Sequence, residues 1–338
     1  MEIRSNRFDC LIVGAGVAGL AAGRSLAAAG HSVCVLDKSR GIGGRLATRR
    51  IEGERFDHGA QFFTAREPKF QNVVDQWVQS GVARPWFGDV GHPRYCGVTD
   101  MNSVAKGFAD GLEVVREQKV ERIERVEGRW IVSTQTQSFE SLSVLLTCPA
   151  PQAVDLVEPS RDRIRNEFMD ILEVIEYDKC ITLMLLLKSE PRLSPDGILQ
   201  FEPEEPIATL TETSVKGTTE RPGLVIQSGA KFADEHYESF KEEIFSELVG
   251  ALPIEGKLEV DGMSLQKWRF AKRRPHDLEQ SFSSDAALGL WHAGDGYLAP
   301  RVEGAIQSGW RVADSIIEFL SALNRSSSKR EGENRDAG

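Results

Sequence analysis

Three glycines near the start of the chain have the spacing of a nucleotide-binding turn. Gly14, Gly16 and Gly19 form the pattern Gly-x-Gly-x-x-Gly, with Ala18 directly before the last glycine. The first glycine of such a pattern permits a tight turn, the second lets a pyrophosphate approach the backbone, and the third allows close helix packing. A helix that begins at this turn directs its N-terminal amides at phosphate oxygens. The pattern therefore predicts a dinucleotide site.

An acidic residue and a second glycine-rich loop follow the turn. Asp37 comes about twenty residues later, where a carboxylate usually accepts hydrogen bonds from a ribose, and Lys38 follows it. Residues 39–48 read SRGIGGRLAT, so Gly44 and Arg45 would offer bare amides and a guanidinium to a pyrophosphate. An NAD domain has no need of this loop, and its presence favours FAD over NAD. The alternative for the loop is a surface turn with a solvated arginine.

The elements around the glycines have the order that a nucleotide-binding fold requires. Residues 8–13 form a short apolar run typical of a buried parallel strand. Residues 17–29 are mostly Ala and Leu and predict a helix that Gly30 ends. Residues 31–36 predict a second strand. A strand, a glycine turn, a helix, a strand and an acid in this order are much stronger evidence than the glycines alone.

Later segments indicate further strands and two helices. Residues 119–126 and 129–134 predict a hairpin that turns at Glu127-Gly128, and an apolar run at residues 143–147 predicts another strand. Further strands of a mainly antiparallel sheet are expected at residues 180–187, 197–201 and 223–228. Helical spacing of apolar residues marks 232–252, which should cover that sheet, and 302–323.

These patterns predict an α/β fold in which a Rossmann-type FAD-binding domain is interleaved with an α+β substrate domain built on a mainly antiparallel sheet. The FAD-binding domain is expected to be discontinuous, comprising residues 1–65, 98–155 and 275–325. Residues 66–97 and 156–274 would form the substrate domain. Residues 326–338 contain almost no apolar side chain and are predicted to be a disordered tail.

Composition excludes several classes of function. A formal net charge of -10 opposes a nucleic-acid surface, which needs many uncompensated Lys and Arg side chains. The five cysteines are scattered without a CxxC pair, which predicts reduced thiols and a cytoplasmic protein, and no His/Cys cluster indicates a metal site. The apolar stretch at residues 10–30 contains Arg24 and regularly placed glycines, so neither a signal peptide nor a membrane span is expected.

Several blocks along the chain carry a family resemblance. In order they are the GGR loop, FDHGAQFFTAR at residues 56–66, KWRF at 267–270, AGDG at 293–296 and RVEGA at 301–305. Together they resemble the renalase family within the flavin amine oxidase group, over nearly the whole chain. The resemblance implies a hydride transfer to flavin from 2-dihydro or 6-dihydro isomers of NAD(P)H, giving NAD(P)+. Oxygen would then take the electrons and become hydrogen peroxide.

The resemblance also implies roles for individual residues. Asp295 would lie near the ribityl and pyrophosphate portion of FAD, and a helix starting near Val302 would direct its amides at the flavin N1 and O2 region. A residue near Val120 would meet the adenine through its backbone. No cysteine follows Cys180, so the flavin is expected to be bound non-covalently.

On the substrate side, the candidates facing the flavin are residues of the matching blocks, namely Gln61, Phe62 and Trp268. His58 is a candidate for a hydrogen bond near the cofactor, and its alternative is a structural histidine. Trp291 and Tyr297 are weaker candidates, and core packing is the alternative for all the aromatic residues. A basic cluster at residues 267–274 would either receive substrate phosphates or form a solvated face. Three rival functions remain open: a flavin amine oxidase acting on a small amine, a nicotinamide-dependent dehydrogenase, and a non-catalytic flavin-binding protein.

Overall fold

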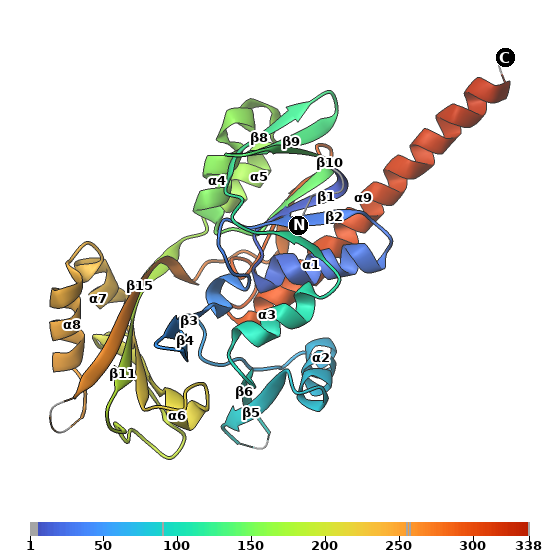
Figure 1. Ribbon diagram of the computed structural model, residues 1–338. Coiled ribbons are helices and arrows are strands. Elements are labelled where there is room, and N and C mark those ends of the chain that lie inside the picture. The colour runs from blue at the N-terminus through green and yellow to red at the C-terminus, as the bar shows by residue number, and fades with distance from the viewer. Residues whose placement is uncertain (1–5, 90, 255, 257, 337–338) are drawn as a thin grey trace. The chain divides into compact units, whose positions relative to one another are not determined.

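The protein consists of two compact units, each assembled from separate stretches of chain (Figure 1). A computed structural model describes residues 6–89, 91–254, 256 and 258–336. The first unit comprises Met1–Gly44, Phe108–Glu176 and His276–Gly338, and the second comprises Arg45–Gly107 and Tyr177–Pro275. The boundaries differ from those expected, because residues 45–65 and 98–107 pack with the second unit and residues 156–176 with the first.

The first unit is built on a largely parallel sheet, which confirms the Rossmann-type prediction. Its strand order is β16-β17-β10-β1-β2-β7, and the hairpin β8–β9 continues from β10. The central strand β1 is parallel to both β2 and β10, and β10 is parallel to β17. The strands are β1 (Arg7–Val13), β2 (Val33–Leu36), β7 (Glu113–Val115), β8 (Val120–Val126), β9 (Arg129–Thr134), β10 (Ser138–Leu146), β16 (Phe282–Asp285) and β17 (Leu290–Ala293).

The predicted hairpin turn and the helices predicted at residues 17–29 and 302–323 are confirmed. Glu127 and Gly128 both have positive φ, at 48° and 79°, as the tight turn between β8 and β9 requires. Helix α1 packs so closely against α9 that a Cβ on Gly309 would lie only 2.3 Å from the carbonyl oxygen of Ala18. The helical segments of this unit are α1 (Val17–Ala28), α4 (Ala150–Val157), the 3-10 turn at Glu158–Arg163, α5 (Asn166–Glu173) and α9 (Val302–Asp336).

Helix α9 is longer than the sequence predicted. Its backbone remains helical through Asp336, where disorder was expected from residue 326, while residues 337 and 338 lie outside the described residues. The prediction rested on the lack of apolar side chains, which removes tertiary packing but does not itself end a helix. A helix that is already nucleated extends at little cost, and no proline interrupts this segment.

The second unit is built on a five-stranded sheet with the order β12-β13-β14-β11-β15, in which every neighbouring pair is antiparallel. The predicted antiparallel sheet is therefore confirmed. The sequence analysis missed β13 and β15, because polar residues interrupt both and neither forms an apolar run. The strands of this sheet are β11 (Tyr177–Leu187), β12 (Ile198–Gln200), β13 (Ile207–Glu212), β14 (Gly223–Ser228) and β15 (Val260–Arg273).

The single helix expected at residues 232–252 is two helices, α7 (Ala230–His236) and α8 (Lys241–Gly250). The break leaves backbone carbonyl groups without helical partners. The Nζ of Lys267 on β15 donates hydrogen bonds to the carbonyl oxygens of Tyr237 and Ser239, the latter at 3.0 Å. A contact from a distant strand therefore stabilises the interruption.

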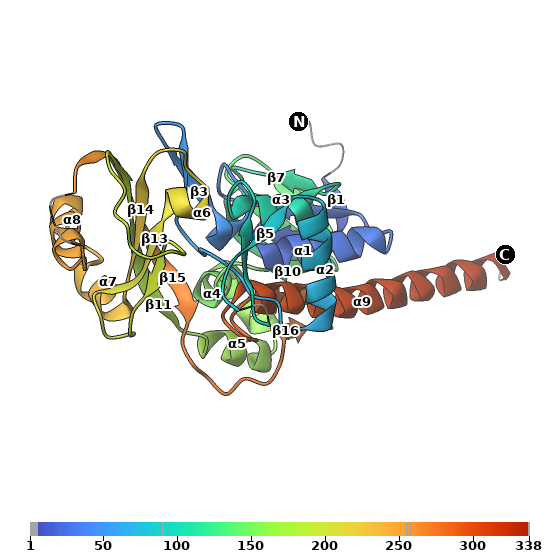
Figure 2. The ribbon, with the colours of Figure 1, turned by 90° about the horizontal axis from the view of Figure 1, so that it is seen from below.

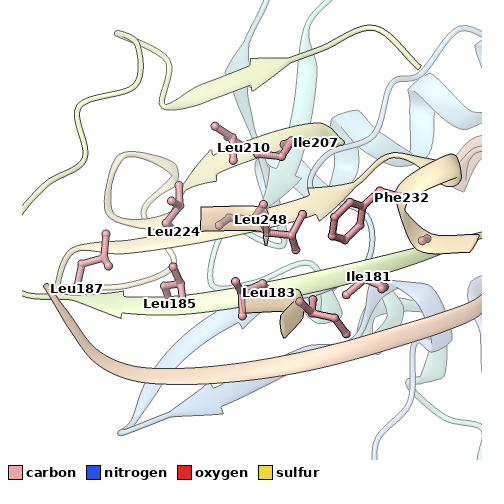
Figure 3. Packing of buried hydrophobic residues seen from close by; sticks show 12 residues of the cluster. Ile181, Leu183, Leu185, Leu187, Ile207, Leu210, Leu224, Phe232 and Leu248 are labelled. Atoms are coloured by element: carbon pink, nitrogen blue, oxygen red, sulfur yellow. The ribbon is translucent and has the colours of Figure 1, made fainter. Parts of the chain in front are cut away.

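Both helices cover the sheet, as Figure 2 shows. Phe232 of α7 and Leu248 of α8 pack into the same apolar cluster as Leu183 and Leu185 of β11 (Figure 3). The other elements of the second unit are β3 (Thr48–Ile51), β4 (Glu54–Asp57), α2 (Pro68–Gln79), β5 (Ala83–Phe87), β6 (Arg94–Gly97) and α6 (Thr213–Lys216). The 3-10 turn Gly44–Leu46 and α3 (Asn102–Ala109) cross the boundary between the two units. Among the helices described, none has the length and apolarity that crossing a membrane requires.

Hydrogen bonds from β3 explain why residues 45–65 belong to the second unit. Arg49 donates to the Oγ of Ser264 at 2.9 Å, to the carbonyl oxygen of Leu265 at 3.0 Å and to the Oε1 of Gln266 at 2.8 Å. The β3–β4 hairpin is therefore fixed to β15. Residues 156–176 belong to the first unit because α5 packs against α4 and the preceding 3-10 turn against β8.

Candidate functional site

The three glycines of the turn at the end of β1 differ in whether a side chain would clash with the protein. A Cβ at Gly14, whose φ is 113°, would lie 2.7 Å from the Oγ1 of Thr147, and one at Gly19 would lie 2.2 Å from the carbonyl oxygen of Gly14. The protein itself therefore requires both of these glycines. A Cβ at Gly16 would meet no described heavy atom within 4 Å. The space over Gly16 is open, as the approach of a pyrophosphate demands.

The N-terminus of α1 is suited to an anion. Its N-cap residue is Gly16, which has no side chain, and its first turn contains no acidic residue. Neither a capping side chain nor a carboxylate of the first turn therefore competes for the first amides of the helix. The partial positive charge of these amides favours a phosphate. Together with the open space over Gly16, this arrangement fits the pyrophosphate of FAD.

Asp37 connects the glycine turn to the second loop. Its Oδ2 accepts a hydrogen bond from the amide of Ala15 and its Oδ1 one from the amide of Ser39, both at 2.7 Å. An ionised carboxylate has about four acceptor sites, so ribose hydroxyls can bind in addition to these amides. Gly43 donates to the carbonyl oxygen of Ala15 at 2.7 Å, and Gly44 lies against Gly16.

The structure thus brings Gly14, Gly16, Ala18, Gly19, Asp37 and Gly44 together in the first unit, with Lys38 exposed beside them. The phosphate contact expected of Arg45 stays a prediction. Its guanidinium lies 5.8 Å from the centre of the Tyr177 ring and donates to the carbonyl oxygen of Ala271 at 3.4 Å, both within the second unit.

The segment after β17 belongs to the first unit and is tied to α9. Gly294 has a φ of 150° and donates its amide to the Oγ of Ser308 at 2.9 Å. Asp295 follows it and is buried, and Val302 begins α9 as predicted. Val120 begins β8 in the same unit. The roles of these three residues toward FAD stay predictions.

Two residues near this segment belong to the core. Trp291 is fully buried with its ring edge against Phe319, so the packing alternative describes it. Tyr297 is also buried, and its hydroxyl lies 2.7 Å from the Nδ1 of His292, whose Nε2 lies 2.9 Å from the carbonyl oxygen of Cys148. Burial lowers the pKa of His292 from 6.5 to about 4, against the opposing effects of the Cys148 carbonyl and Asp295.

The low pKa of His292 predicts a loss of stability in acid. The unfolded histidine binds a proton below pH 6.5 and the folded one only below about 4, so stability present at neutral pH is lost as pH falls through this window. We expect His292 to contribute a loss of about 2 kcal/mol between roughly pH 7.5 and 4.5. Thermal unfolding of wild type and His292→Gln at both pH values measures it. An equally steep pH dependence in the variant would contradict the assignment.

In the second unit, His58 and Trp268 form an aromatic pair. Their ring centres are 5.3 Å apart with an angle of 18° between the planes, and the indole N–H of Trp268 donates to the backbone carbonyl of His58 at 2.8 Å. Burial, followed by the charge of Arg49, lowers the pKa of His58 to about 4, although Asp57 opposes the shift. The imidazole is therefore neutral at physiological pH.

Gln61 and Phe62 come from the same segment of chain as His58. The side-chain N–H groups of Gln61 donate to the carbonyl oxygens of Asp57 at 2.7 Å and Gly59 at 3.2 Å, so its amide is engaged inside the second unit. Phe62 is half-buried and meets the ring of Phe87 edge-on, with the centres 5.1 Å apart.

A buried ion pair beside these residues was missed by the sequence analysis. The Nζ of Lys216 lies 2.7 Å from the Oδ2 of Asp57, and the two side chains are 0% and 1% exposed. Lys216 stands in a short polar stretch with no motif, 159 positions from Asp57. Only the folded structure reveals the pair.

The basic cluster at residues 267–274 is largely engaged by the protein. Lys267 binds backbone carbonyls, Arg269 lies 3.8 Å from Glu238, and Arg274 pairs with Asp178 at 2.7 Å. These contacts, and the 62% and 44% exposure of the Arg269 and Arg274 side chains, favour the solvated face over a phosphate site. Within the part of the chain that the structure describes, no group of three or more His, Cys, Asp or Glu residues is placed to hold a metal ion.

Two family profiles match the chain. A profile of NAD(P)-binding Rossmann-like domains matches residues 12–77, and one of flavin-containing amine oxidoreductases matches residues 83–317. Putrescine oxidase of Kocuria rosea is 37% identical over 68 residues, which is 20% of this chain and 14% of that protein. The L-amino-acid oxidase of Echis ocellatus is 39% identical over 75 residues, covering 22% of this chain and 14% of that protein. The matched segment is thus a small part of each relative.

Solved structures share the fold over nearly the whole chain. Putrescine oxidase bound to putrescine superposes with a TM-score of 0.66 at 16% identity, covering 92% of this chain and 99% of that one. Cyclohexylamine oxidase from Brevibacterium oxydans IH-35A gives a TM-score of 0.67 at 15% identity, covering 93% and 99%. At these identities the likeness concerns the fold.

Proposed function

Because the chain belongs to the family of flavin-containing amine oxidoreductases, we propose that it is an FAD-dependent oxidase acting on a 2-dihydro or 6-dihydro isomer of NAD(P)H. When bound, FAD accepts two electrons as a hydride and passes them to oxygen, which takes up a proton and becomes hydrogen peroxide. Loss of hydride restores an aromatic pyridinium in the substrate. The protein must therefore position a flat ring rather than supply a strong acid or base.

The observation that carries this proposal is the neutral character of the aromatic pair. The rings of His58 and Trp268 are stacked on one another, and burial keeps the imidazole uncharged because it lowers the pKa of His58 to about 4. Such surfaces stack well against a neutral heteroaromatic ring. A protonated amine would instead be stabilised by a nearby carboxylate.

The buried carboxylates described in the second unit are already engaged. Asp57 is paired with Lys216, and Asp100 lies 3.5 Å from the Nε of Arg55. Glu212 accepts a hydrogen bond from the amide of Leu193 at 3.1 Å. Within the described part of this unit, each buried carboxylate thus has a partner of its own, which favours an uncharged substrate ring over a small ammonium.

The two units would divide the work. In the first, Gly16 and the first turn of α1 would bind the FAD pyrophosphate, and Asp37 the ribose. Val120, Asp295 and Val302 would hold the adenine, ribityl and pyrimidine portions. In the second, Trp268, His58 and Phe62 would stack the substrate ring and keep water away from it, while Gln61 orders the segment that carries His58. The five free cysteines, of which none is exposed, agree with a reducing compartment such as the cytoplasm.

Oxidation of a small amine is the second candidate. The family profile and the fold shared with putrescine oxidase and cyclohexylamine oxidase favour it. In that case the same aromatic residues would hold a neutral amine, and its product would be an imine.

Anaerobic mixing of the FAD-loaded protein with each class of substrate tests the two candidates. We expect 2-dihydro or 6-dihydro nicotinamide dinucleotides to bleach the visible absorbance of the flavin, and putrescine and cyclohexylamine to leave it unchanged. Ordinary 4-dihydro NADH and NADPH are the matched controls. Readmitting air should restore the absorbance and yield one hydrogen peroxide per dinucleotide oxidised. Bleaching by the amines alone would overturn the proposal and establish the second candidate.

A further inference from the structure

The buried ammonium of Lys216 contacts three side chains of the second unit. Besides Asp57 at 2.7 Å, its Nζ lies 3.2 Å from the Oε1 of Gln61 and 5.3 Å from the centre of the Trp86 ring. Removing an ammonium and a carboxylate from water costs several kcal/mol per ion before their attraction compensates. Apolar residues of the same volume would fill this space at no such cost. Stability alone therefore does not account for the pair.

The two polar partners of Lys216 are the ends of one short loop. Asp57 ends β4, and Gln61 follows four residues later, donating its own side-chain N–H back to the carbonyl oxygen of Asp57 at 2.7 Å. The Nζ of Lys216 therefore contacts the residues at both ends of this loop, which the Gln61 side chain also joins to one another. Two further bonds hold the loop backbone, because the amide of Ala60 donates to the carbonyl oxygen of Arg45 at 2.9 Å and that of His58 to the carbonyl oxygen of Ala47 at 3.3 Å.

His58 lies between these two ends. Its ring stacks on Trp268, and its carbonyl accepts the indole N–H. The orientation of the His58 ring consequently depends on the conformation of residues 57–61. Lys216 holds the residues on both sides of this ring, in addition to the backbone bonds of His58 and Ala60.

We infer that Lys216 is a positioning residue of the proposed substrate site, which fixes the 57–61 loop so that His58 stays stacked on Trp268. The inference rests on the proposed function for the identity of the substrate. The backbone of Lys216 is held separately, since Arg84 donates to its carbonyl oxygen and Gly217 ends the helix in the left-handed region with a φ of 78°. Substitution of the side chain therefore removes the ammonium without releasing α6.

The test compares Lys216→Met with the charge-neutral double variant Asp57→Asn/Lys216→Met. The single variant leaves a buried carboxylate without its counter-ion and is expected to be strongly destabilised. The double variant removes both charges, and its asparagine side chain keeps an oxygen for the bonds that Asp57 accepts from the Thr48 hydroxyl and the Met101 amide. It should fold and retain FAD. Lys241→Met, at an exposed lysine of α8, is the matched control.

The kinetic readout is the split between affinity and rate in anaerobic flavin reduction. In the double variant we expect the substrate concentration for half-saturation to rise about tenfold while the limiting rate changes less, as loss of substrate positioning predicts. Gln61→Met, which keeps the ion pair but opens the loop, should show the same split. The inference would be overturned if both variants fold, bind FAD and reach half-saturation at the same substrate concentration as wild type.

Hydrogen exchange of the peptide spanning residues 57–63 supplies a readout that needs no substrate. Faster exchange in the double variant and in Gln61→Met, with unchanged exchange elsewhere in the sheet, is the expected result. Unchanged exchange in this peptide would refute the positioning role even if no dihydronicotinamide reduces the wild-type flavin. The failure of the inference and that of the proposed function are thereby distinguished.

Discussion

A Gly16→Val variant should purify folded and nearly colourless. The Cβ at this position meets no described heavy atom within 4 Å, and Gly16 has φ -73° and ψ 170°, an extended conformation that valine adopts readily. The added methyl groups would enter the space that the pyrophosphate must occupy. We expect FAD affinity to fall by roughly 100-fold or more, which is about 2.7 kcal/mol. Flavin absorbance per protein and titration of the apo-protein with FAD measure this loss.

Gly19→Ala is the informative comparison for this result. Its Cβ would lie 2.2 Å from the carbonyl oxygen of Gly14, so the clash is with the protein and not with the ligand. This variant should have a lower thermal midpoint as apo-protein, whereas Gly16→Val should unfold like wild-type apo-protein. A destabilised Gly16→Val apo-protein, or one that binds FAD normally, would show that the open space over Gly16 is not the phosphate site.

The first unit could be predicted because local patterns specify it. The glycine turn, the apolar strand before it and the helix after it are adjacent in sequence, and each has its own physical signature. The hairpin at Glu127-Gly128 is likewise a local signal, since two successive residues with positive φ favour one tight turn. Asp37 was placed by its distance along the chain, although its bonds to the Ala15 and Ser39 amides were not foreseen.

The second unit was harder to predict because distant contacts determine it. Strand β15 has no fully buried position and carries many charges, so its sequence resembles a polar surface segment. The break between α7 and α8 depends on Lys267, and the burial of Lys216 depends on Asp57. No periodicity or motif connects residues so far apart. A buried lysine can be recognised only when its partner and the apolar atoms around it are known.

Substitution of Trp268 should separate the two contributions of the aromatic pair. Trp268→Phe keeps a ring for stacking but removes the N–H that donates to the His58 carbonyl, a bond worth about 1 kcal/mol. Trp268→Leu removes the ring as well, and such aromatic contacts contribute roughly 0.5–1.5 kcal/mol more. We therefore expect the half-saturating concentration of the dihydronicotinamide to rise by up to about 5-fold in the first variant and up to about 30-fold in the second.

The graded order of these two effects distinguishes a substrate surface from ordinary core packing. Both variants should retain FAD, because Gly16, the first turn of α1 and Asp37, which are proposed to bind it, belong to the first unit. Phe240→Leu serves as the control. Phe240 is 82% exposed in the same unit, so its substitution should leave the half-saturating substrate concentration unchanged. If Trp268→Leu loses stability but saturates with substrate like wild type, then the pair only packs the sheet. The neutral rings would then no longer argue for a nicotinamide over an amine, and the second candidate would become the better supported one.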